Sequence, residues 1–331
     1  MMKPTRHILF GLSLLTATAF TTSCNSVLGD DDINHKEADT MELAFTRSGE
    51  SSSATSGFLI FWKETKGDFF TTEVANLNAY QTIKYNTGKP YPKEGTEVSV
   101  TGFSPSNMQL ANDYQTLSLP DGTTAGTLDV CAAEKIIRGS HYNIFRETMV
   151  FEHTLTKVTF YAKRDETMEG NQLVNNIQVT IPENYLATEW QWNGILGKYV
   201  AGTTHNTDLV SDRSEPLTEV EKAYNIIECY LKLPASNEGT LQNITMEADV
   251  RKVGETSGQA KHKIWKLKSI QLYEKDGETP VANAAAGDAY QVVFNFNHDS
   301  FSLQAIKKPW EKGGLITVPI DPNGGESNHN N

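Results

Sequence analysis

Short runs that alternate apolar and polar residues recur along this chain, and they constrain its fold more than any other feature. In the run 244–250 the four even-numbered residues are apolar, while the odd-numbered ones are Thr245, Glu247 and Asp249. Successive side chains of a β-strand point to opposite faces, so this alternation predicts a strand with one buried and one solvated face. Other strand-like runs lie at 58–62, 97–100, 177–181 and 290–296, and most of them alternate in the same way.

Residues that favour turns separate these runs, as at 86–90, 120–122 and 275–277. Glycine there supplies positive φ, and proline presets the geometry of a turn. Helical periodicity is scarce, and the best candidate for a helix is 216–226, where Pro216 suits a first helical position. Short strands, many turns and little helix predict an all-β fold made of sandwich domains.

The N-terminus has the pattern of a lipoprotein signal peptide. Lys3 and Arg6 precede an apolar run from Ile8 to Phe20, and small residues lead from there to Cys24. The apolar run is too short for a transmembrane helix, which needs about 20 apolar residues. We expect residues 1–23 to be removed and Cys24 to carry lipid; the alternative is an ordinary secreted protein in which Cys24 has no such role.

Beyond Cys24 the chain divides into four predicted parts. Residues 24–47 form a polar, acidic tether that ends in a strand-like run, and residues 323–331 form a tail without apolar residues that we expect to be disordered. A mostly polar stretch places the boundary between two sandwich domains, 48–147 and 148–322, at Glu147. In the run that follows, the apolar parity changes near Thr156, which predicts a β-bulge or a strand that changes partner.

Charge and cysteine content limit the partners and the redox chemistry. The formal net charge is −12, which argues against a nucleic-acid partner because phosphate binding needs a basic face. Besides Cys24, the chain holds Cys131 and Cys229, both in largely apolar surroundings. An exported protein could join them, but we favour two buried free thiols over a disulfide.

No catalytic or metal-binding motif is found in the sequence. None of the eight histidines lies two or four residues from another, and no G-x-S-x-G or phosphate-binding glycine loop occurs. We therefore expect no enzyme activity, no cofactor and no bound metal. Trp190 and Trp192 share one side of an extended segment and could contact a sugar ring, although we favour a role in the core, where alternate aromatic residues usually lie.

One segment resembles a known family. Residues 151–160 read Phe-Glu-His-Thr-Leu-Thr-Lys-Val-Thr-Phe, which is similar to the F-x-H-x-L-(S/T)-K-V-x-F strand of the fimbrillins. Segments 128–133 and 309–314 support the match, in the order seen in the Mfa-like fimbrial subunits of Bacteroidetes. With the lipoprotein motif, the resemblance spans nearly the whole chain. It implies two transthyretin-like β-sandwich domains in tandem and export to the outer membrane and cell surface; within the motif, we interpret His153 as a packed or hydrogen-bonded structural residue.

The resemblance also implies a function, that of a stalk or tip subunit in a fimbrium that supports adhesion. Such subunits are processed by proteolysis and assembled with other fimbrial subunits by strand exchange. Cleavage after Arg47 would release a first strand that carries Leu43 and Phe45. A donor strand at 315–320 of a neighbouring subunit would then fill the groove by β-augmentation, presenting Ile316, Val318 and Ile320.

Two alternatives remain open at this point. Both terminal segments could be ordinary strands of one monomer. The protein could also be a monomeric surface lipoprotein that binds a glycan, and under either interpretation a surface glycan or protein of a host or bacterium is a candidate partner.

Overall fold

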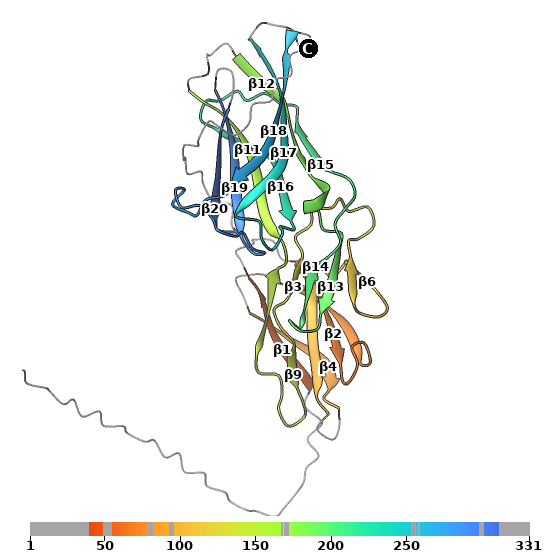
Figure 1. The fold of residues 1–331 in the computed structure, drawn as a ribbon. Coiled ribbons are helices and arrows are strands. Elements are labelled where there is room, and N and C mark those ends of the chain that lie inside the picture. The colour runs from red at the N-terminus through yellow and green to blue at the C-terminus, as the bar shows by residue number, and fades with distance from the viewer. Residues whose placement is uncertain are drawn as a thin grey trace, which may run out of the picture. The chain divides into compact units, whose positions relative to one another are not determined.

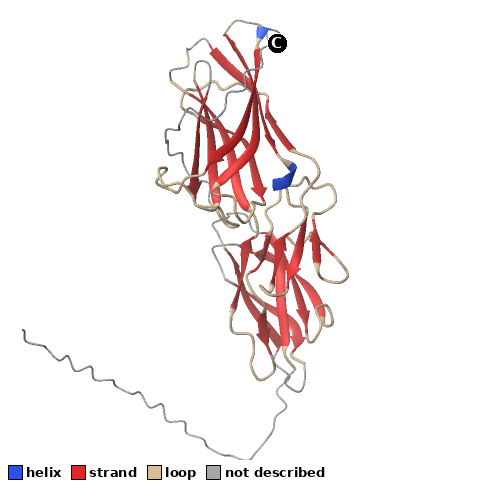
Figure 2. Cartoon of the chain, in the orientation of Figure 1, coloured by secondary structure: helices blue, strands red, loops and turns tan. Residues whose placement is uncertain are grey.

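The computed structural model describes residues 40–48, 55–77, 82–92, 96–166, 168, 172–252, 254, 256, 259–297 and 301–310. These residues belong to one compact unit. Among them the secondary structure is almost entirely β, and helix is limited to short 3₁₀ turns such as Glu183–Tyr185 (Figure 2). The prediction of an all-β fold with little helix is confirmed. None of the described segments forms a helix long and apolar enough to cross a bilayer.

The first sandwich is built on an eight-stranded sheet of order β3-β2-β5-β8-β10-β1-β4, with β9 beside β5. A smaller sheet of order β14-β13-β7-β6 covers part of one face. The strands of the large sheet are β1 (Thr40–Arg47), β2 (Thr55–Trp62), β3 (Phe70–Leu77), β4 (Ile83–Pro90), β5 (Val98–Ser104), β8 (Cys131–Ala133), β9 (Ile137–Gly139) and β10 (Thr148–His153). Those of the small sheet are β6 (Gln109–Leu110), β7 (Thr116–Ser118), β13 (Glu189–Asn193) and β14 (Lys198–Ala201).

Parts of the large sheet are buried on both faces. In β2, Leu59 and Phe61 belong to one apolar cluster, whereas Ile60 between them belongs to another that includes Trp190 of the small sheet. Every residue of β5 is buried for the same reason. A strand covered on both sides does not need a polar face, which explains why residues 58–62 of β2 are apolar throughout.

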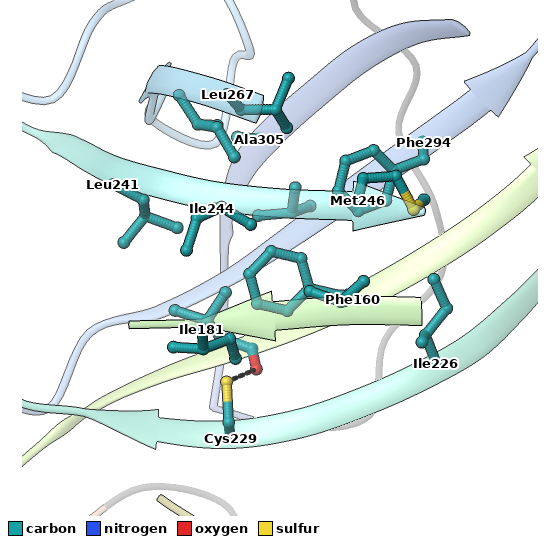
Figure 3. Close-up of a cluster of buried hydrophobic side chains, with 14 of the residues drawn as sticks. Phe160, Ile181, Ile226, Cys229, Leu241, Ile244, Met246, Leu267, Phe294 and Ala305 are labelled. Atoms are coloured by element: carbon teal, nitrogen blue, oxygen red, sulfur yellow. Dashed lines mark hydrogen bonds between the residues drawn. The ribbon is translucent and has the colours of Figure 1, made fainter. Parts of the chain in front are cut away.

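The second sandwich consists of two four-stranded sheets, β16-β11-β19-β20 and β15-β12-β17-β18 (Figure 1). Their apolar faces share one core, in which Ile244 and Met246 of β17 lie near Phe160 and Phe294 of the opposite sheet (Figure 3). The alternation predicted for 244–250 is therefore confirmed. The strands are β11 (Thr156–Arg164), β12 (Gln172–Ile181), β15 (Leu209–Arg213), β16 (Ala223–Leu231), β17 (Thr240–Lys252), β18 (Lys261–Gln271), β19 (Ala289–Phe296) and β20 (Phe301–Lys308).

The change in apolar parity near Thr156 marks the point where the chain changes its strand partners. β10 pairs with β1 and β8 in the first sandwich, and β11 pairs with β16 and β19 in the second. A boundary at Glu147 would separate β10 from its partners. The predicted range 148–322 also includes β13 and β14, whose strand pairing places them in the first sandwich.

Two local predictions need correction. The helix predicted at 216–226 is absent, because residues from 223 onward form β16 and pair with β11, and Val220 is 46% exposed instead of lying on a buried stripe. The turn predicted at 86–90 lies inside β4, where the register with β1 shifts. There Asn86 Oδ1 accepts a hydrogen bond from the Gly88 N–H, and Gly88 has a φ of 67°. The turn residues thus form a bulge within the strand.

Candidate functional site

Three adjacent strands of the first sandwich place an arginine, a histidine and a cysteine side chain at the same end of the sheet. Arg47 is the last residue of β1, His153 is the last residue of β10, and Cys131 is the first residue of β8. β10 lies between the other two, parallel to β1 and antiparallel to β8, with His153 directly opposite Cys131. The strand order therefore places the three residues close together.

Asp129, just before β8, connects these side chains. Its carboxylate forms a salt bridge with the Arg47 guanidinium, and the two side chains are only 13% and 5% exposed. The same carboxylate accepts a hydrogen bond from His153 Nδ1 at 2.8 Å, and Cys131 Sγ lies 3.4 Å from this nitrogen. A buried charge is tolerated only when it is paired, so Asp129 and Arg47 depend on each other.

The segment after β20 closes the site from the second sandwich. The Trp310 ring stacks on the His153 ring, with 3.6 Å between the centroids and 22° between the planes. Tyr230 and Lys157, both from the second sandwich, lie 6.1 Å and 5.9 Å from the Trp310 ring. The chain beyond β20 therefore passes against His153.

Burial governs the electrostatics of the site. Burial disfavours the charged form of Arg47 and so lowers its pKa. The neighbouring Cys131 and Asp129 favour the charged form more strongly, so the pKa of the guanidinium is raised. Burial is also the main cause that raises the pKa of the Cys131 thiol, with Asp129 adding to it. Among the described residues, Arg47 Nε and His153 Nε2 are buried without a hydrogen-bond partner.

The three segments that carry the sequence resemblance meet here. Segment 128–133 contributes Asp129 and Cys131, segment 151–160 contributes His153, and segment 309–314 contributes Trp310. The interpretation of His153 as a packed, hydrogen-bonded residue is confirmed. Sequence reasoning missed the link from Arg47 to Asp129, and the only available clue was that the segments occur together.

The strand predicted to be displaced lies in the interior of the sheet. β1 pairs with β10 on one side and with β4 on the other. Its side chains Met41, Leu43 and Phe45 are 0%, 2% and 1% exposed and belong to one apolar cluster. Phe45 packs edge-on against Phe151, with 6.5 Å between the ring centroids. Removing β1 would therefore open an apolar groove between two strands with unpaired backbone groups.

The tryptophan pair is part of the core of the first sandwich. Trp190 is 1% exposed, and its Nε1–H donates to Thr154 Oγ1 at 2.7 Å. Trp192 is partly buried, and Lys66 Nζ lies 3.3 Å from its ring centroid. Burial lowers the pKa of Lys66 to about 7, with Asp113 opposing the shift. The structure shows Trp190 and Trp192 packed inside and not as an exposed pair of rings.

Other predicted residues divide between the described and the remaining parts of the chain. Cys131 and Cys229 are both free and buried, which confirms the prediction of two unpaired thiols. The lipidation residue Cys24, the donor residues Ile316, Val318 and Ile320, and the tail 323–331 lie outside the described residues.

Comparison with protein-family models and with curated proteins finds no match. Among solved structures, a "putative cell adhesion protein" from Bacteroides uniformis matches with a TM-score of 0.51 and 11% identity, over 82% of this chain and 98% of that chain. A fimbrial protein from Bacteroides vulgatus matches with a TM-score of 0.48 and 9% identity, over 82% of this chain and 99% of that chain. The first match shows a shared fold, in agreement with the fold that the resemblance to fimbrillins implies.

Proposed function

We propose that this chain is a structural subunit of a bacterial surface fimbrium, exported as a lipoprotein, and not an enzyme. The observation that carries the proposal is the position of β1. This strand is the first of the described strands, ends at an arginine, and fills an interior position of a sheet with three buried apolar side chains. Cleavage after Arg47 would leave a groove that a strand from another subunit could fill.

We infer that the C-terminal segment provides the donor strand. It leaves β20 and passes Trp310, which lies against His153 beside the end of β1. Residues 315–320 follow a few positions later, with Ile316, Val318 and Ile320 at alternate positions. These apolar residues would occupy, in a neighbouring subunit, the places of Met41, Leu43 and Phe45.

Filament assembly by cells tests the proposal. Arg47→Ala should yield full-length lipidated monomers and no filaments, and truncation after Gly314 should permit cleavage but stop elongation. Because Arg47 is also half of a buried ion pair, Asp129→Asn is the matched control: it breaks the same pair and keeps the cleavage site. Filaments from Asp129→Asn, with an N-terminus at Ser48, and none from Arg47→Ala support cleavage as the cause. Filaments of normal length from both Arg47→Ala and the truncation would refute strand exchange at these residues.

The second candidate is a monomeric glycan-binding lipoprotein that keeps its N-terminal strand. Burial of Trp190 weakens the sequence argument for a sugar-stacking pair. Immunogold labelling separates the two candidates, because label along filaments is expected only for a fimbrial subunit. Either protein would carry lipid on Cys24 of the precursor.

A further inference from the structure

Asp129, Cys131 and His153 have the composition of a zinc site. A carboxylate oxygen, a thiol sulfur and an imidazole nitrogen all lie within 4.8 Å of one another. Zinc binds these three donor types in tetrahedral sites, where a water molecule can supply the fourth ligand. The side chain of His153 is 2% exposed and that of Asp129 is 13% exposed, so the cluster is part of the interior and not an exposed acidic patch.

In the unprocessed chain a cation already occupies this cluster. The Arg47 guanidinium is paired with Asp129 and lies close enough to Cys131 for the two groups to influence each other. If β1 leaves after cleavage, Arg47 leaves with it, because it is the last residue of the released segment. Asp129 would then be a buried carboxylate without its counter-charge, which is strongly unfavourable.

We propose that Asp129, Cys131 and His153 bind a zinc ion once Arg47 is gone, so that Arg47 closes a latent metal site in the precursor. Its link to processing rests on the proposed function, whereas the ligand set itself does not. Loss of Arg47 removes one positive charge. Zinc adds two, and the Cys131 S–H bond breaks to form the S–Zn bond while its proton passes to solvent. The net charge of the site is therefore unchanged.

The histidine can take part without a change of charge. In the precursor Nδ1–H donates to Asp129, and Nε2 is buried without a partner. When Nδ1 donates its electron pair to zinc, the proton moves from Nδ1 to Nε2, and the ring stays neutral. Trp310, stacked on the ring, restricts its orientation.

Metal titration of the purified full chain tests the ligand set without any cleavage. A second histidine, His262, contacts Asp249 and Glu247 at an exposed site and could bind zinc independently. All proteins should therefore carry His262→Ala. With zinc alone, calorimetry should detect one ion per chain in Arg47→Ala and none in the chain that keeps Arg47. Cobalt(II) should give the absorption of a thiolate ligand in the same variant only.

The matched control is the double variant Arg47→Ala, Cys131→Ser, which should lose the bound zinc and the thiolate absorption. Arg47→Met, which keeps an apolar stem, replaces Arg47→Ala if circular dichroism shows that the alanine variant is unfolded. A folded Arg47 variant that binds no zinc overturns the proposal. The chain that keeps Arg47 and carries His262→Ala, once cleaved after Arg47 and freed of residues up to 47, should also bind one zinc ion. If the cleaved chain binds no zinc while Arg47→Ala does, the ligand set is correct but its link to processing is wrong. Normal filament assembly would then show that the proposed function still holds.

Discussion

Asp129 holds together the ends of three strands through a single carboxylate. It pairs with the buried Arg47 guanidinium and accepts a hydrogen bond from His153. Removing one partner of a buried ion pair costs about 3–5 kcal/mol, because the other charge is left unpaired. We therefore expect Asp129→Asn to lower the free energy of unfolding of the precursor by that amount, as measured by urea denaturation.

An exposed ion pair provides the control for Asp129→Asn. Lys135 and Glu147 form a salt bridge with side chains 53% and 61% exposed. Such pairs contribute about 0–1 kcal/mol, so Glu147→Gln should have little effect. An equal loss of unfolding free energy in the two variants would mean that the buried Arg47–Asp129 pair contributes no more than an exposed pair.

The sequence identifies the members of the site but does not show that they lie close together in the fold. Asp129, His153 and Trp310 were each included in segments that resemble fimbrillins, and Arg47 was identified as a cleavage residue. Which residues become neighbours depends on strand order, and β10 is inserted between β1 and β8 although it follows both in the chain. Nothing in the local sequence determines that order.

At the scale of the element, β1 should stabilise only the unprocessed protein. Phe45 is 1% exposed, and replacing a buried phenylalanine by alanine costs about 3–5 kcal/mol. Phe45→Ala should therefore lower the stability of the precursor by this amount, measured by thermal unfolding, yet leave the cleaved chain unchanged. Phe294→Ala in the core of the second sandwich is the control, because it should destabilise both forms. An equal loss in the cleaved chain would show that β1 remains in place.

Strands with one solvent-exposed face are predictable from alternation, and other strands are less so. The alternation of 244–250 correctly identified the buried face of β17, which lies in a two-layer sandwich. A helix is predicted at 216–226 because Leu217 and Tyr224 lie at helical spacing. Instead, residues from 223 onward form β16, which is stabilised by pairing with β11, a strand some 70 residues earlier in the chain. Such distant pairing overrides a weak local preference.

For the whole molecule, truncation can separate an observed contact of the C-terminal segment from its proposed function. Trp310 is 8% exposed and packs against His153, whereas residues 315–320 are the proposed donor. A chain that ends after Gly314 should keep the melting temperature of the full-length monomer and fail to polymerise. A chain that ends after Lys308 also loses Trp310 and should be less stable by about 3–5 kcal/mol. A normal melting temperature for the shorter chain would show that Trp310 does not secure the site.

The path of the chain between the sandwiches has a mechanical consequence. Within the described residues the backbone passes from one sandwich to the other three times, between β10 and β11, between β12 and β13, and between β14 and β15. Tension applied between the two sandwiches divides among several covalent connections instead of stretching one. Bending is restrained as well, because the three crossings must deform together, and torsion about one crossing is opposed by the other two. In the proposed fimbrium, the three crossings in each subunit would add to the stiffness of the fibre.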